Sequence, residues 1–133
     1  MGLTGGCQCG AVRYEVEGEA VHHALCHCAD CRASAGAPAV AWIAFPAAGF
    51  KLTKGVAKAY NGSGASIRHF CANCGTGLYF LNEQFLPGIV DIQSATLDDA
   101  NDHSPGAHVQ TAERLGYMAR LADLPEFERF PGM

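Results

Sequence analysis

Four of the seven cysteines of this chain form two pairs with the spacings of metal half-sites. Cys7 and Cys9 form a CxC pair. On an extended strand, side chains two residues apart point to the same face, so both sulfurs can reach one ion. Cys71 and Cys74 form a CxxC pair, and Gly75 permits the left-handed backbone of a tight knuckle. Together the two pairs predict a closed four-thiolate zinc site with a structural role.

The other three cysteines, Cys26, Cys28 and Cys31, lie in the stretch CHCADCRASAG. If the chain passes there from a strand into a helical turn, all three sulfurs can reach one ion. Three protein ligands and a vacant fourth position are the arrangement of a catalytic zinc site, where water or a substrate thiolate takes the vacancy. We therefore expect two zinc ions per chain, one structural and one catalytic.

Two alternatives for this trio stay open. A histidine could complete it as a second structural site, although His27 should point to the opposite face of its strand and His69 should lie nearer the other site. Alternatively, Cys28 and Cys31 form a disulfide when zinc is lost. The histidines available are His22, His23, His27, His69, His103 and His108.

The thiols are expected to be reduced. The chain has 7 cysteines, an odd count that does not suit a pure disulfide framework, and its first residues, MGLTGGCQCG, show no export signal. Both observations favour a cytoplasmic location. The longest apolar run, residues 37–48, is shorter than a bilayer span and contains Pro38 and Pro46, so we expect a soluble protein with no membrane contact.

The elements that must position these cysteines are predicted to be short strands. Gly 16 and Pro 6 are spread along the 133 residues, which indicates short elements joined by turns. Val12, Tyr14 and Val16 alternate with charged residues, as in a half-buried strand. Further short apolar runs predict strands at AVHHALCH, PAVAWIAFP, AKAYNG, SIRHF, GLYFL and GIVDI, separated by turn signals such as Ala48-Gly49, Asn61-Gly62 and Pro87-Gly88. We expect a mainly β chain that forms a single domain over residues 1–133.

Two stretches favour short helices instead. ADCRASA, directly after Cys28, is rich in alanine and is closed by Gly36. In the tail, residues 111–121 place four apolar side chains on one helical face, namely Ala112, Leu115, Met118 and Ala119.

Charge is distributed unevenly along the chain. Residues 31–82 contain no acidic residue, although the whole chain has a formal net charge of −4. The cations of this stretch could balance zinc-thiolate sites or recruit an anionic substrate, and both can hold. The negative net charge argues against general nucleic-acid binding. These cations are Arg32, Lys51, Lys54, Lys58 and Arg68.

The order of the motifs resembles the glutathione-dependent formaldehyde-activating enzyme family, which also includes centromere protein V. The resemblance rests on GGCQCGAVRYEVEG, CHCADCRASAG, HFCANCGTGLYF, ATLDD and HVQTAERLGYMARLADLPEF, and covers residues 5–127. It implies a β-tent zinc fold of small antiparallel sheets with one or two short helices. It also implies a structural zinc on Cys7, Cys9, Cys71 and Cys74 and a catalytic zinc on Cys26, Cys28 and Cys31, in agreement with the division made by spacing. Tyr117 stands where the family's tail usually has a tryptophan, which bears on specificity.

The activity that the resemblance implies is that of a carbon-sulfur lyase or synthase. Such an enzyme adds the thiol of glutathione to formaldehyde to give S-(hydroxymethyl)glutathione, or cleaves this adduct. A zinc with three thiolate ligands is a weak Lewis acid and suits the presentation of a substrate thiolate. Glutathione carries two carboxylates, and any of the five cations could bind one.

Two other functions stay open at this point. The chain could bind or carry glutathione or another thiol without turnover, or it could be a structural or interaction module. The sequence does not decide the oligomeric state.

Overall fold

The computed structural model describes residues 2–132. Within these residues, ten short strands form two sheets, accompanied by a single α-helix and five short 3-10 helices. The strands are β1 (Leu3–Gly6), β2 (Arg13–Val16), β3 (His22–Cys26), β4 (Val40–Pro46), β5 (Phe50–Lys54), β6 (Lys58–Ser63), β7 (Ser66–Phe70), β8 (Gly77–Leu81), β9 (Ile89–Gln93) and β10 (Ala107–Val109). The helices are α1 (Ala29–Ala35), η1 (Ala47–Gly49), η2 (Ser94–Thr96), η3 (Ala100–Asp102), η4 (Thr111–Glu113) and η5 (Gly116–Asp123).

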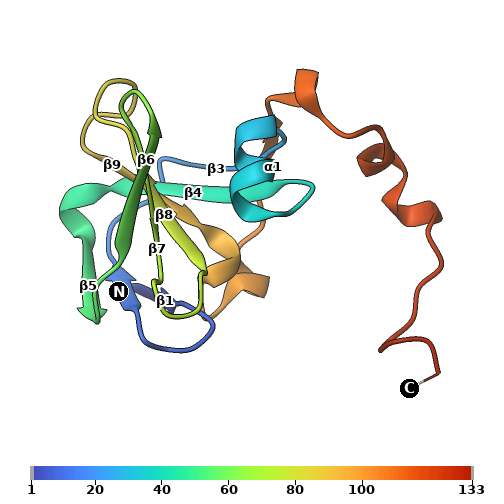
Figure 1. Cartoon of the computed structure of the whole chain (residues 1–133), viewed down its shortest axis with the longest axis horizontal. Coiled ribbons are helices and arrows are strands. Elements are labelled where there is room, and N and C mark those ends of the chain that lie inside the picture. Colours follow the sequence, from blue (N-terminus) through green and yellow to red (C-terminus); the bar gives the residue numbers. More distant parts are fainter. Residues whose placement is uncertain (1, 133) are drawn as a thin grey trace.

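The two sheets differ in size. The smaller has the strand order β1-β2-β5, and the larger has the order β10-β3-β4-β9-β8-β7-β6 (Figure 1). Neighbouring strands are antiparallel in both sheets, except that β10 runs parallel to β3. The prediction of a mainly β fold of small antiparallel sheets is therefore confirmed, with this one parallel pair as an addition.

The main core joins the two sheets. Val12, Tyr14 and Val16 are at most 2% exposed, as their alternation predicted, and they belong to one apolar cluster with side chains of β4 and β9 such as Ile43 and Ile92. This cluster covers one face of the larger sheet. The opposite face carries a second, smaller apolar cluster formed by Cys26, Cys31, Val40 and Trp42, with Cys28 and Phe80 packed against it.

The predicted helix after Cys28 is confirmed as α1. The Cys28 sulfur caps its N-terminus by accepting a hydrogen bond from the Cys31 amide, and Gly36 ends it in the left-handed conformation with φ 65°. The predicted helix of the tail is present, but as two short 3-10 helices and not as one regular α-helix. Its residues form the 3-10 helices η4 and η5, and the backbone of Arg120 breaks the second of these.

The tail does not pack onto the sheets. From η4 onward, over residues 111–132, its side chains are exposed or only partly buried, and it runs past α1 and away from the strands (Figure 1). The apolar face expected over residues 111–121 is therefore not matched by a buried partner, so nothing selects a regular α-helix there.

Other local predictions are also corrected by the structure. Cys7 and Cys9 do not lie on a strand but in the turn between β1 and β2, where Gly10 has φ 79°. Asn61-Gly62 lies inside β6, at an irregularity of its pairing with β7, and not at a turn. Pro87-Gly88 does mark a turn, since Gly88 has φ 71°.

Candidate functional site

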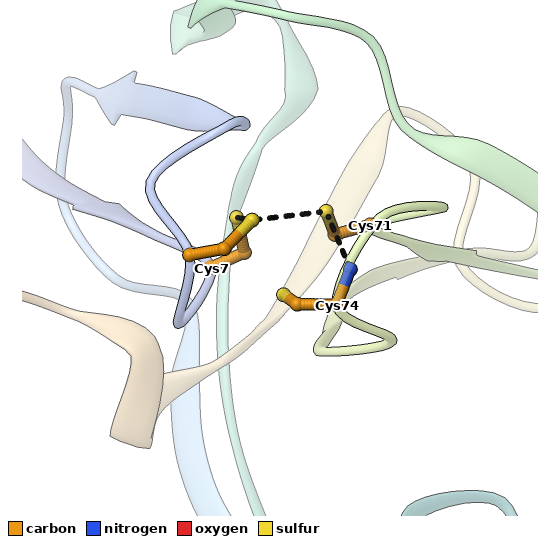
Figure 2. A group of neighbouring side chains, drawn as sticks. Cys7, Cys71 and Cys74 are labelled. Carbon is orange, nitrogen blue, oxygen red and sulfur yellow. Dashed lines mark hydrogen bonds between the residues drawn. The ribbon is translucent and has the colours of Figure 1, made fainter.

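The structure brings Cys7, Cys9, Cys71 and Cys74 together as the spacing predicted. Their four sulfur atoms lie within 4.8 Å of one another. The first pair comes from the β1–β2 turn and the second from the turn between β7 and β8, so the cluster joins the two sheets. Figure 2 shows Cys7, Cys71 and Cys74 converging from these two turns.

The distances between the sulfurs fit a tetrahedral zinc site. Zn–S bonds of about 2.3 Å place the sulfurs of a tetrahedral site about 3.8 Å apart. The Cys7 and Cys9 sulfurs are 3.7 Å apart, and the Cys9 and Cys71 sulfurs are 3.8 Å apart. All seven cysteines are free thiols, so no disulfide competes for these positions.

Hydrogen-bond donors surround the four sulfurs, as expected for thiolates that share their charge with an ion. The backbone amide of Val12 donates to Cys7 Sγ at 3.2 Å, and the amide of Cys74 donates to Cys71 Sγ at 3.4 Å. The Asn73 side chain donates to Cys9 Sγ at 3.2 Å. The donor set therefore suits a closed metal centre, in which Cys7 and Cys71 are buried and Cys9 is exposed.

The trio Cys26, Cys28 and Cys31 forms a second cluster, whose three sulfurs also lie within 4.8 Å of one another. Cys26 ends β3, Cys28 caps α1, and Cys31 lies in the first turn of that helix. Cys26 and Cys31 are buried, whereas Cys28 is partly exposed. The predicted passage from strand into helix thus delivers all three sulfurs to one place.

No histidine completes this trio. Among residues 2–132, no histidine nitrogen or carboxylate oxygen joins the three sulfurs within 4.8 Å. His27 is 1% exposed and points away from the trio, with its Nε2 2.9 Å from Nδ1 of His108. His69 stacks on Tyr79 with ring centroids 4.4 Å apart.

Arg68 is the cation at the trio, and it comes from β7 on the neighbouring part of the sheet. Its Nη2 lies 3.8 Å from Cys31 Sγ and donates to Asp30 Oδ2 at 2.7 Å. The guanidinium also lies over two aromatic rings, 5.3 Å from the centroid of Phe80 and 6.0 Å from that of Trp42. Its side chain is 15% exposed, so little solvent screens its charge.

The other cations of the acid-free stretch are engaged or exposed elsewhere. Lys51 pairs with Glu15 at 3.0 Å, and Arg32 donates to the backbone oxygens of His27 and Glu113. Lys54 and Lys58 lie exposed on β5 and β6. Of the five alternatives that the sequence left open, Arg68 is the one beside the trio.

A cavity of about 290 Å³ opens beside the trio. All three cysteines line it, together with Arg68, Trp42 and Phe80. A wider hollow of about 530 Å³ lies on the other side of Arg68, where Tyr60 and His69 belong to its lining. Trp42 and Phe80 were not singled out in the sequence. PAVAWIAFP is apolar throughout, so its pattern does not reveal which side chains face a cavity.

The largest pKa shifts among the cysteines are those of Cys74 in the first cluster and Cys31 in the second, and they have opposite directions. The hydroxyl and backbone of Thr76 lower the pKa of Cys74 to about 5. Burial raises the pKa of Cys31 to about 12, although the hydrogen bond from Arg68 lowers it. A bound cation deprotonates a coordinating thiol, and Cys31 is the sulfur on which such a cation would have the larger effect.

Residues 2–113 match the family model described as glutathione-dependent formaldehyde-activating enzyme. The chain belongs to this family. The match includes both cysteine clusters and the cavity and ends at Glu113, so η5 and the remainder of the tail lie outside it.

Two further proteins are similar to this member of the glutathione-dependent formaldehyde-activating enzyme family. An uncharacterised lyase of Schizosaccharomyces pombe (strain 972) is 34% identical over 76 residues, which are 57% of this chain and 55% of the relative. The chain thus spans about half the length of the curated relative it matches. A crystal structure of a Rhodobacter sphaeroides protein, a structural genomics target, aligns with a TM-score of 0.64 at 22% identity, over 80% of this chain and 99% of that one. This likeness supports the fold.

Tyr117 and the tail lie outside the cavity. Tyr117 is 48% exposed and lines a shallow hollow beside α1 with Ala29 and Arg32. Tyr117 therefore does not line the cavity in this structure, and no contact there supports the expectation that this position bears on specificity.

Among residues 2–132, no helix is long and apolar enough to cross a membrane.

Proposed function

We propose that this chain is a lyase-type enzyme that makes or breaks the carbon–sulfur bond of a thiol adduct of a small aldehyde. The first pair of substrates to test is glutathione and formaldehyde, because the family description names both. The printed name of the Schizosaccharomyces pombe relative, an uncharacterised lyase, points in the same direction. The observation that carries the proposal is a trio of cysteine sulfurs, short of one ligand, in the wall of a cavity.

In this proposal, Cys26, Cys28 and Cys31 hold a catalytic zinc, and Cys7, Cys9, Cys71 and Cys74 hold a structural zinc. When bound to the trio, zinc would supply one open coordination position that acidifies a thiol, while its three thiolate ligands keep it a weak Lewis acid.

The side chains around the trio would orient the substrate. Trp42 and Phe80 exclude water from the cavity wall, since Trp42 is 6% exposed and Phe80 packs against the same cluster. Arg68 faces both hollows, so its guanidinium is placed to bind a substrate carboxylate. Its hydrogen bond to Cys31 stabilises negative charge on that sulfur.

The reaction is balanced without any further reactant. In the forward direction the thiol sulfur bonds to the carbonyl carbon, the C=O π bond breaks, and the thiol proton ends on the oxygen. In the reverse direction the hydroxyl proton returns to sulfur as the C–S bond breaks. The chain has to position the two reactants and lower the thiol pKa.

Exchange spectroscopy by NMR tests this function, because the uncatalysed addition is already fast. Formaldehyde and glutathione are mixed at equilibrium with the purified zinc-loaded chain, and the exchange rate of the adduct is measured against protein concentration. We expect a rate that rises in proportion to the protein and is lost in Cys31→Ser. A rate equal to the uncatalysed one overturns the enzyme proposal. If calorimetry then still detects glutathione binding, the chain is a thiol carrier.

A further inference from the structure

The proposed reaction leaves one buried charge of the cavity without a role. Asp91 in β9 is 8% exposed and lines the same 290 Å³ cavity as the three cysteines. In the register of the larger sheet, it lies directly opposite Phe80 on one side and Ala44 on the other. Residues directly opposite each other share a face of the sheet. Asp91 therefore lies on the face that carries Trp42, Arg68 and the trio.

Within the described part of the chain, the carboxyl group of Asp91 is left without an ion-pair partner. Its Oδ1 atom is buried and makes no hydrogen bond, and among residues 2–132 no cation lies within ion-pair distance of its carboxyl group. Arg68, on the same face, is instead engaged with the exposed Asp30. Burying a carboxyl group without a partner is unfavourable. An unpaired carboxyl group in a cavity wall is therefore a candidate to bind a polar group of a ligand.

The carboxyl group and the sulfurs lie at different ends of the cavity. Strand β3 lines it from His22 through Ala24 to Cys26, and four residues of extended chain span about 13 Å. Ala44 pairs with both His22 and Asp91, which places the carboxyl group at the His22 end. A ligand that reaches from the trio to Asp91 must therefore be several bonds long.

We propose that Asp91 binds the ammonium group of the substrate, so that this cavity selects aminothiols whose thiol and amine lie several bonds apart. The inference rests on the proposed function, in which the substrate sulfur lies at the trio. In glutathione, eight bonds separate the sulfur from the γ-glutamyl ammonium. A carboxylate at Asp91 would meet a like charge, so the carboxylates of the substrate point toward Arg68 and the wider hollow.

The charged surroundings of Asp91 agree with this assignment. Burial raises the pKa of Asp91 to about 6, although the electrostatic interaction with His22 lowers it. The other titratable groups that line the cavity are Asp30, Arg68 and the three cysteines. A bound ammonium group favours the ionised carboxylate and lowers this pKa.

Calorimetry with two thiols that differ in one group tests the proposal. The ligands are glutathione and its desamino analogue, glutaryl-cysteinyl-glycine, and the proteins are the full chain, Asp91→Asn and the exposed control Asp102→Asn. We expect the wild-type chain and the control to bind glutathione at least about 10-fold more tightly than the analogue, because a hydrogen bond to a charged group is stronger than one between neutral groups. In Asp91→Asn this preference should vanish.

The outcomes separate this inference from the proposed function. If the wild-type chain binds both thiols equally, or if Asp91→Asn keeps the preference, Asp91 does not bind the amine, while a thiol site remains. If the wild-type chain binds neither thiol, both proposals are overturned. A second readout uses the wild-type chain alone. The ¹³C shift of the Asp91 carboxyl should report a pKa that falls on addition of glutathione and not on addition of the analogue.

Discussion

The partly buried Arg68 and the buried Asp91 carry opposite charges on one sheet face, and they do not pair with each other. Phe80 lies between them in the register of the larger sheet, so the two side chains are separated by a strand. Arg68 is stabilised by Asp30 and by two aromatic rings. Asp91 has no such support. At the scale of single residues, the cavity therefore has one satisfied charge and one unsatisfied charge.

The unsatisfied carboxyl group is predicted to lower the stability of the fold at neutral pH. The pKa of Asp91 is raised in the folded chain, from 3.8 to about 6. The unfolded chain therefore ionises first as the pH rises, and stability is lost between these two values and stays lost above them. We expect Asp91→Asn to increase the free energy of unfolding by up to about 3 kcal/mol at pH 8 and by about half of that at pH 5.

Denaturant unfolding of both proteins at the two pH values measures this gain. Asp102→Asn, which removes an exposed carboxyl group from η3, is the matched control and should show little change at either pH. If the increase in the free energy of unfolding caused by Asp91→Asn is no larger at pH 8 than at pH 5, Asp91 does not have a raised pKa in the folded chain. The same substitution, Asp91→Asn, is expected to remove the preference for an aminothiol. The carboxyl group that selects the ligand is therefore also the group that lowers the stability of the fold.

At the scale of elements, both halves of the four-cysteine cluster are turns that use a glycine. Gly10 follows the CxC pair with φ 79°, and Gly75 follows the CxxC pair with φ 86°. A methyl group added at either position would meet no other atom within 4 Å. The glycines are therefore required for their backbone conformation and not for space.

A substitution at Gly75 tests whether the cluster needs the left-handed backbone conformation. Gly75→Ala should destabilise the fold by about 1–2 kcal/mol, because an L-residue is forced into the left-handed region. Gly116→Ala is the control, since Gly116 also has open space around it but lacks a positive φ. Thermal unfolding of the zinc-loaded variants measures both effects. Equal melting temperatures for the two variants would show that the knuckle tolerates other backbone conformations.

Most elements could be predicted from the sequence because their patterns are local. Alternation marked β2, and the alanine run closed by Gly36 marked α1. The CxC pair of Cys7 and Cys9 predicts a strand but lies in a turn, because two such sulfurs can lie on the same side in either conformation. Strand β10 has three exposed residues, and its partner lies about 80 residues earlier, so no local pattern marks it.

Only part of the candidate site could be predicted from the sequence. Spacing alone divided the seven cysteines as the structure groups them. The cavity wall was not predictable, because it depends on register: Arg68, Phe80 and Asp91 come from three strands and share a face only through their pairing. Five cations were equally eligible in the sequence, and tertiary structure singled out Arg68.

At the scale of the whole molecule, the two cysteine clusters are expected to contribute differently to the stability of the fold. The four-cysteine cluster links the turn of the smaller sheet to a turn of the larger one, so an ion bound there joins the two sheets (Figure 2). The trio lies within one sheet and the helix that follows its strand. Loss of the first ion should therefore destabilise the whole chain strongly, and loss of the second should destabilise it less and leave the sheets in place.

Zinc content and melting temperature, measured together, check this difference. We expect two zinc ions per purified chain and one in each of Cys74→Ser and Cys31→Ser. Cys74→Ser should also lower the melting temperature strongly, whereas Cys31→Ser should lower it less. One ion in the wild-type chain would contradict the division into four and three ligands. A similar loss of stability in both variants would contradict the separate roles.

The parallel pairing of β10 with β3 has a consequence for the order in which the site is made. Val109 and Gln110 complete the cavity wall beside Cys26, and His108 contacts His27 across 81 residues of sequence. A ribosome that adds about 5–20 residues per second synthesises this wall roughly 4–16 s after the trio. The cysteines therefore leave the ribosome before the strand that encloses them. A metal ion that binds the trio during synthesis would therefore meet an open site, which β10 would cover only afterwards.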